Sequence, residues 1–123
     1  MTTIEPQLWA DRAGAAVSFY EEAFGATTLM RVGEGDDIVA RLAVGDARFW
    51  VAAADSGSGR FSPPAVSGAT GRTLLIVDDP DVVVRQAVGA GATETSPVAD
   101  EHGWRVGRIA DPHGHEWEIG RPL

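Results

Sequence analysis

An internal repeat constrains the fold of this chain more than any other feature of its sequence. Gly-Ala-Thr at residues 25–27 recurs at residues 91–93, and Arg-Leu-Ala at 41–43 is matched by Arg-Ile-Ala at 108–110. The two copies are offset by about 66 residues, a length that fits one supersecondary unit. The chain should therefore fold as two tandem copies of the same unit.

The first copy combines one stretch of helical periodicity with several stretches of strand periodicity. Alternating apolar and polar residues predict strands at residues 4–10, 26–32, 38–44 and 48–53. Between the first two strands, apolar residues recur at helical spacing, with Asp11 as the expected N-cap and Gly25 as the expected end of the helix. The first copy therefore has the element order β-α-β-β-β.

The second copy repeats this order after a segment rich in Ser, Gly and Pro. Strands are predicted at residues 72–77, 92–95, 104–110 and 115–120, and Asp78-Asp79-Pro80 marks the start of a helix. We therefore expect a single α+β domain, with module 1 at residues 1–54, a linker at 55–71 and module 2 at 72–123. The helices should cover the outer face of a curved mixed sheet whose open face surrounds a cavity.

The stretch from Asp111 to Ile119 combines a tight turn, a short strand and two carboxylates. Its Asp-Pro and Gly residues favour a turn. In the strand that follows, alternation places Trp117 on the helix-covered face and both Glu116 and Glu118 on the open face. Glu118 is the strongest candidate for a functional carboxylate. The alternative is that both glutamates are solvated on an exposed sheet face.

Charge and composition exclude several classes of function. The chain has 123 residues, a net charge of −8 and no cysteine. Its basic residues are all arginines that do not cluster in sequence, which argues against binding of nucleic acid phosphates. A disulfide, a thiolate metal site and a cysteine nucleophile are excluded. The sequence has neither a signal peptide pattern nor an apolar run of membrane-spanning length, so we expect a cytoplasmic protein without a membrane partner.

Four motifs follow one another along most of the chain. They are Phe-Tyr-Glu-Glu-Ala-Phe-Gly-Ala at residues 19–26, Val-Asp-Asp-Pro-Asp at 77–81, Ala-Val-Gly-Ala-Gly-Ala at 87–92 and Asp-Pro-His-Gly-His-Glu-Trp-Glu-Ile at 111–119. Together they resemble the vicinal oxygen chelate superfamily, which contains glyoxalase I, bleomycin-resistance proteins and extradiol dioxygenases. The resemblance implies the duplicated fold. It leaves the activity open, because this scaffold serves lyases, epimerases, dioxygenases, thiol transferases and proteins that only bind.

The resemblance also implies a metal site, for which the sequence lacks most ligands. Enzymes of the superfamily hold a divalent ion with His or Glu side chains from the first and last strands of each module. Here only Glu118 keeps a ligand, since Trp50 stands where Glu is expected and Arg72 or Leu74 stands where His is expected. A divalent ion needs three or four converging donors. We therefore expect no metal and no other cofactor, as in binding-type members of the superfamily.

The residues expected on the open face suit a flat ligand. Indole rings offer surfaces for stacking, and guanidinium groups bind anions in a planar geometry. The expected ligand is a flat aromatic or anionic molecule, bound by Gln7, Trp9, Arg48, Trp50, Arg72, Leu74 and Glu118. The alternative is an ion-pair network that closes the cavity, formed by Glu5, Arg48, Arg72 and Glu118.

Three functions are open at this point. The expected one is a small-molecule binder that acts by sequestration, for which the resemblance implies a homodimer with pockets near the interface. The second is an enzyme, either a metal-dependent lyase, isomerase or dioxygenase, or a metal-free catalyst with Glu118 as its base. His102 can act as an acid or base if it lies over the cavity. The third is a partner module whose cavity is filled by its own side chains.

Overall fold

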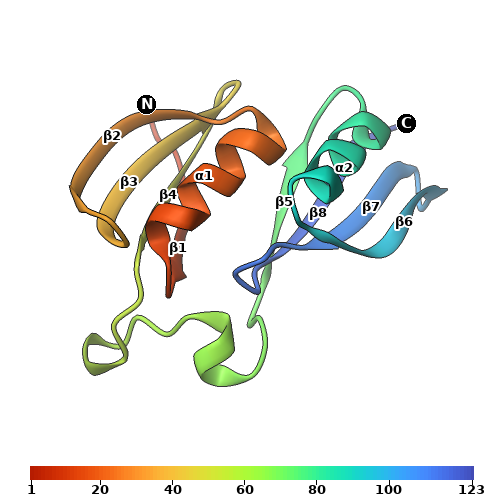
Figure 1. Ribbon diagram of the computed structural model, residues 1–123. Helices are drawn as coiled ribbons and strands as arrows, with labels where there is room; N and C mark the ends of the chain where they lie inside the picture. The colour runs from red at the N-terminus through yellow and green to blue at the C-terminus, as the bar shows by residue number, and fades with distance from the viewer.

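Two β-α-β-β-β modules lie side by side in the structure, a computed structural model that describes residues 1–123 (Figure 1). The first holds β1 (Gln7–Ala10), α1 (Ala13–Phe24), β2 (Thr27–Glu34), β3 (Asp37–Val44) and β4 (Ala47–Ala53). The second holds β5 (Arg72–Ile76), α2 (Pro80–Gly89), β6 (Thr93–Glu101), β7 (Trp104–Ala110) and β8 (Glu116–Pro122). Between them run two short 3-10 helices, η1 (Ser56–Ser58) and η2 (Pro63–Val66). The predicted α+β class and its duplicated element order are confirmed.

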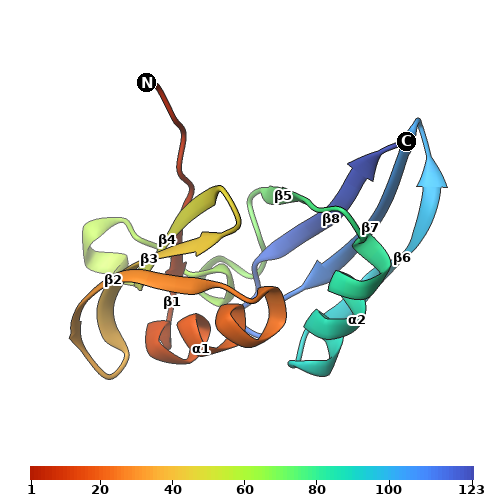
Figure 2. The same cartoon turned by 90° about the horizontal axis from the view of Figure 1, so that it is seen from above.

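The strands form two four-stranded mixed sheets, one in each module. Their orders are β1-β4-β3-β2 and β5-β8-β7-β6, in which β1 with β4 and β5 with β8 are the parallel pairs. The strands β1 and β5 are therefore edge strands. Figure 2 shows both helices on the same side of the sheets, so each sheet has one helix-covered face and one open face. Neither helix combines the length and hydrophobicity that a membrane-spanning segment needs.

One hydrophobic core joins the two modules. Trp117 of β8 is only 1% exposed, and its ring lies 5.5, 4.9 and 5.5 Å, between centroids, from the rings of Tyr20, Phe24 and Phe49. All three partners belong to module 1. The predicted inward orientation of Trp117 is confirmed. A buried tryptophan of one module thus packs against three aromatic residues of the other, which couples the stability of the two modules.

Two local predictions are wrong, and both errors have a physical cause. Asp11 does not cap α1, because the N-cap is Arg12, which makes no side-chain capping bond. Asp36, from the turn between β2 and β3, accepts a bond from a backbone N–H of the first helical turn instead, at 3.4 Å. The strand predicted at 92–95 continues to Glu101, because an edge strand tolerates Pro97 where its pairing is irregular.

Candidate functional site

The seven residues predicted to bind a ligand are divided among several cavities. Gln7, Trp9 and Arg72 line a pocket under the linker, and a smaller pocket of about 260 Å³ next to it is lined by Gln7, Trp9 and Trp50. The remaining predicted residues line two other grooves, one with Arg48 and Leu74 and one with Leu74 and Glu118. Gln7, Trp9, Trp50 and Arg72 therefore line the pocket under the linker or the one next to it, whereas Arg48, Leu74 and Glu118 line other grooves, although Glu118 lies 3.9 Å from Arg72.

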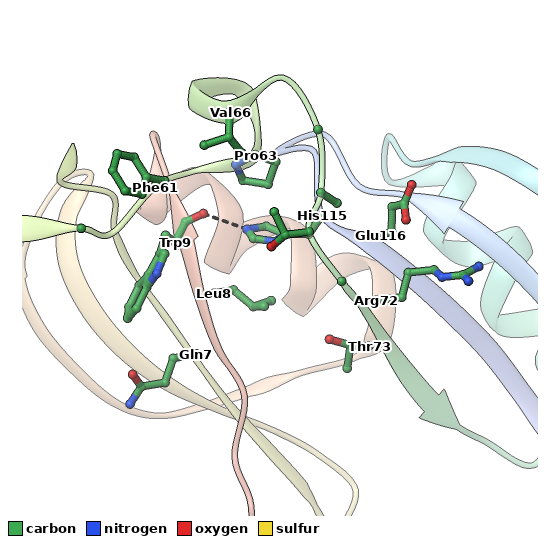
Figure 3. A pocket seen from close by; sticks show the side chains of 15 residues that line it. Gln7, Leu8, Trp9, Phe61, Pro63, Val66, Arg72, Thr73, His115 and Glu116 are labelled. Atoms are coloured by element: carbon green, nitrogen blue, oxygen red, sulfur yellow. Dashed lines mark hydrogen bonds between the residues drawn. The ribbon is translucent and has the colours of Figure 1, made fainter.

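The pocket under the linker, here called the linker pocket, is a cavity of about 440 Å³ between the modules (Figure 3). Its walls are the edge strand β1, the linker, and the starts of β5 and β8. Its lining consists of Gln7, Leu8, Trp9, Gly59, Phe61, Pro63, Val66, Gly68, Ala69, Thr70, Gly71, Arg72, Thr73, His115 and Glu116. In Figure 3 the side chains of Trp9 and Phe61 lie on one side and that of Arg72 on the other. A tryptophan of module 1 and an arginine of module 2 thus line the same pocket.

Trp9 is held in place by residues from outside its own module and strand. The imidazole Nε2 of His115 lies 2.8 Å from the carbonyl oxygen of Trp9, a hydrogen bond that joins the turn before β8 to β1. The guanidinium carbon of Arg60, from the linker, lies 6.0 Å from the centroid of the Trp9 ring. This is within the range of a cation–π contact. The indole therefore has a defined position at the boundary of the two modules.

Arg72 has donors available for a ligand. Its ion pair is a long one, with 3.9 Å between its Nη1 and Glu118 Oε2. The same oxygen of Glu118 accepts a hydrogen bond from Arg108 Nε at 2.9 Å. The side chain of Arg72 is 43% exposed. Because a guanidinium carries five N–H donors, Arg72 can bind an anionic group without breaking a short contact.

A compact polar cluster occupies the open face of module 1. Glu5 accepts hydrogen bonds from Nε and Nη2 of Arg41, at 2.9 and 2.7 Å, and from the indole Nε1 of Trp50, at 2.9 Å. The Arg41 hydrogen bond, helped by that of Trp50, holds the pKa of Glu5 below its ordinary value. The guanidinium carbon of Arg41 also lies 5.8 Å from the centroid of the Trp50 ring. Trp50 is therefore anchored by its indole nitrogen.

The equivalent cluster in module 2 has a different charge pattern. Strand pairing places Arg41 opposite Trp50 in module 1 and Arg108 opposite Glu118 in module 2. Trp50 and Glu118 therefore occupy equivalent positions in the two modules. The hydrogen bond to Glu118 raises the pKa of Arg108. With Arg72 nearby, Glu118 is a carboxylate held between two guanidinium groups.

The ion-pair network considered from the sequence forms only in part. Glu5 and Glu118 are both paired, but Arg48 is not their partner, since its Nη1 donates to the backbone oxygens of Gly45 and Ala47 at 2.8 and 3.1 Å. The main partners are Arg41 and Arg108, which sequence reasoning did not assign to the site. The sequence contains a signal for both arginines, because each is the first residue of a repeated triplet, at residues 41–43 and 108–110.

A buried carboxylate organises the turn that precedes β8. Asp111 is 5% exposed and accepts hydrogen bonds from the Tyr20 hydroxyl, from Trp117 Nε1 at 2.9 Å, and from the backbone N–H groups of His113 and His115 at 2.9 and 3.1 Å. Burial, followed by the charge of Asp111, raises the pKa of Tyr20 well above its ordinary value. Asp111 thus fixes His115 beside the linker pocket through its backbone.

The other two histidines have separate environments. His102 lies in the turn between β6 and β7 with a positive φ of 52° and lines the groove that contains Leu74 and Glu118, a cavity of about 340 Å³. His113 lies in the turn before β8, where burial lowers the pKa of its imidazole. A role for His102 as an acid or base requires that it lie over the cavity. His102 lines a groove of module 2 and is not at the linker pocket.

The residues of this chain at the positions where the superfamily binds a metal ion are not suited to hold one. Register pairs Gln7 with Trp50 on β1 and β4, and Leu74 with Glu118 on β5 and β8. Among these four residues only Glu118 offers a carboxylate, and Arg108 and Arg72 already engage one of its oxygens. No three His, Asp or Glu side chains lie close enough together to hold a metal ion. The donor set is therefore unsuited to a divalent cation.

Comparisons with known proteins agree with this architecture. A family model described as "Glyoxalase-like domain" matches residues 4–120. An uncharacterised protein of Mycobacterium bovis is 33% identical over 126 residues, which cover 98% of this chain and 83% of that protein. Among solved structures, TioX from Micromonospora sp. ML1 is 26% identical, with a TM-score of 0.75 and coverage of 99% of this chain and 100% of TioX.

A second solved structure shares the fold at lower identity. It is a bleomycin-binding protein in complex with bleomycin, 21% identical, with a TM-score of 0.70 and full coverage of both chains. At this identity the likeness concerns the fold, which supports many functions. The family match over nearly the entire sequence shows that the chain belongs to the glyoxalase-like domain family.

Proposed function

We propose that this protein binds a flat aromatic molecule with an anionic group and sequesters it without a metal ion. The observation that carries the proposal is the linker pocket, where Trp9 of module 1 and Arg72 of module 2 line one cavity. The ligand ring stacks on the indole of Trp9, and its anionic group binds the guanidinium of Arg72. The volume of about 440 Å³ lies within the range of small-molecule sites.

Ligands larger than the linker pocket have a route toward Trp50. Gln7 and Trp9 line both the linker pocket and the adjoining pocket that contains Trp50. A long ligand can therefore extend past Trp9 along the open face of module 1. There it meets Trp50, whose ring is held by its hydrogen bond to Glu5. Under this proposal Gln7, Trp9, Trp50 and Arg72 are the ligand-binding residues, with Arg72 as the main anchor for charge.

The enzymatic alternatives have less support from the geometry. Glu118, the candidate base, accepts a short hydrogen bond from Arg108 and does not line the linker pocket. A general base must come within hydrogen-bonding distance of the proton that it removes. The metal-dependent alternatives need ligands that the superfamily positions do not supply here. The third alternative, a cavity filled by its own side chains, is opposed by the open volume of the linker pocket.

We infer a homodimer as part of the same proposal. The open faces of both sheets carry exposed apolar side chains, among them Val32 and Val39 in module 1 and Leu74 and Ile76 in module 2. Exposed apolar side chains gathered on the open face of a sheet are typical of a contact with another chain. A second copy that covers these faces would bring Arg48, Leu74 and Glu118, which lie outside the linker pocket, into contact with its own residues.

The binding proposal is tested by a titration with 1-naphthoate, a flat aromatic carboxylate, followed by the indole N–H signals in two-dimensional NMR. We expect the Trp9 signal to shift, and we expect Arg72→Gln to weaken binding about tenfold by removing a charged hydrogen bond. Arg85→Gln, which removes an exposed arginine of α2 outside every pocket described above, is the control and should bind normally. Shifts confined to Trp104, or equal affinity in Arg72→Gln, would refute the assignment of the site.

A further inference from the structure

The linker pocket presents two opposite charges on neighbouring strands. Arg72 is the first residue of β5, and its partner in the parallel register is Glu116, the first residue of β8. Paired residues on adjacent strands project from the same face of a sheet and lie about 5 Å apart. Both side chains line the linker pocket, and both are exposed. One cation and one anion are thus available side by side.

Neither of these charges is neutralised by a short contact. Glu116 takes part in none of the ion pairs of the structure, and the contact of Arg72 with Glu118 is the long one at 3.9 Å. The short bond to Glu118 belongs to Arg108. Arg72 and Glu116 lie side by side on paired strands without an ion pair between them. Two such charges can bind a ligand that carries both complementary charges.

The opposite wall of the pocket is apolar. Phe61 and Val66 of the linker remain 49% and 46% exposed, although both border the pocket, and Trp9 and Leu8 lie beside them. In Figure 3 Trp9 and Phe61 lie on the side of the pocket opposite Arg72 and Glu116. A ligand that fills the pocket therefore needs a charged end with two signs and an apolar, preferably aromatic, end.

Building on the proposed function, we propose that the ligand of the linker pocket is an aromatic α-amino acid or a small molecule that ends in one. Its carboxylate binds Arg72, its ammonium group binds Glu116, and its ring lies against Trp9 and Phe61. An α-amino acid carries its two charges on groups separated by a single carbon, which suits side chains from neighbouring strands. Such a zwitterion has no net charge, so the net charge of −8 on the protein does not repel it at long range.

Three probes that differ only in their charged groups separate this inference from the proposed function. They are L-phenylalanine, 3-phenylpropionate, which lacks the amine, and 2-phenylethylamine, which lacks the carboxylate. Isothermal titration should show L-phenylalanine binding about tenfold more tightly than either of the others, because each charged hydrogen bond contributes separately. Glu116→Gln should remove its advantage over 3-phenylpropionate, and Arg72→Gln its advantage over 2-phenylethylamine.

Matched controls and outcomes make the test decisive. Glu94→Gln and Arg85→Gln remove the same charges from exposed positions that line none of the pockets described above, and should keep the order of the three affinities. If 3-phenylpropionate binds as tightly as L-phenylalanine and its binding depends on Arg72, the zwitterion inference is overturned while the proposed function stands. If none of the three probes binds, both are overturned. If Glu116→Gln leaves the advantage of L-phenylalanine intact, the role of Glu116 is wrong.

Discussion

Among single residues, Asp111 shows how one buried carboxylate can join the two modules. It receives the hydroxyl of Tyr20 from α1 and the indole N–H of Trp117 from β8, while its other oxygen receives two backbone N–H groups of its own turn. A buried charge with all its acceptor sites used is stable, whereas the loss of any donor leaves part of it unsatisfied. The position of β8 relative to α1 therefore depends on this residue.

The raised pKa of Tyr20 leads to a prediction about alkaline conditions. Burial raises the pKa of this phenol in the folded chain above its ordinary value of about 10, so above that pH the unfolded chain loses a proton that the folded chain keeps. The free energy of unfolding should consequently fall with rising pH, by about 1.4 kcal/mol per unit. Tyr20 is the only tyrosine, and lysine and cysteine are absent, so no other side chain titrates in this range.

Urea unfolding at a series of pH values between about 9 and 11 measures this effect, since the only nearby ordinary pKa is that of Tyr20. The matched variant is Tyr20→Phe, which should be less stable at neutral pH but should lack the alkaline decline. An identical decline in wild type and variant would show that Tyr20 is not the group responsible.

Trp117 and Trp50 should differ sharply in their contribution to stability. Trp117 is 1% exposed and surrounded by aromatic rings, so Trp117→Ala should lower the free energy of unfolding by about 3–5 kcal/mol. Trp50 is half-buried on the open face and is held by one hydrogen bond to Glu5, so Trp50→Ala should cost about 1 kcal/mol. Chemical denaturation measures both values. Equal losses for the two variants would contradict the assignment of the faces.

Among the elements, the linker depends on a close contact that its composition does not reveal. A Cβ added at Gly114, in the turn before β8, would lie 2.8 Å from Cβ of Pro63 in η2. Gly114 also has a positive φ of 90°. The linker is thus packed against the turn of module 2 at this point, which sets the position of the residues that cover the pocket.

Gly114→Ala should therefore displace η2 and weaken ligand binding at the linker pocket. We expect a loss of stability of about 2–3 kcal/mol, because a steric clash is added to the backbone cost of a positive φ. Gly45→Ala provides the control, since Gly45 has a φ of 56° but no atom within 4 Å of an added Cβ, so it should lose only about 1 kcal/mol. Thermal unfolding compares the two, and equal losses would mean that the contact with Pro63 is unimportant.

At the scale of the whole molecule, the fold was predictable because its signals are local and repeated. Alternation in β8 correctly separated Trp117 from Glu118, and the turn residues marked most element boundaries. The site was less predictable, because the linker residues 55–71 give no periodic signal for where they lie. That Phe61 would lie on the same side of the linker pocket as Trp9 depends on tertiary packing alone. The internal repeat was enough to single out Arg41 and Arg108, but it did not indicate the residues with which they pair.

The measurement that tests the central claim most directly is native mass spectrometry of the protein purified without chelator and without a metal-affinity step. We predict a homodimer that carries no metal ion and takes up a small aromatic acid, and we predict that Arg72→Gln loses this uptake while Arg85→Gln keeps it. The account would be contradicted by one divalent ion per subunit that disappears in Glu118→Ala. That result would make a metal-dependent enzyme the correct description of this chain.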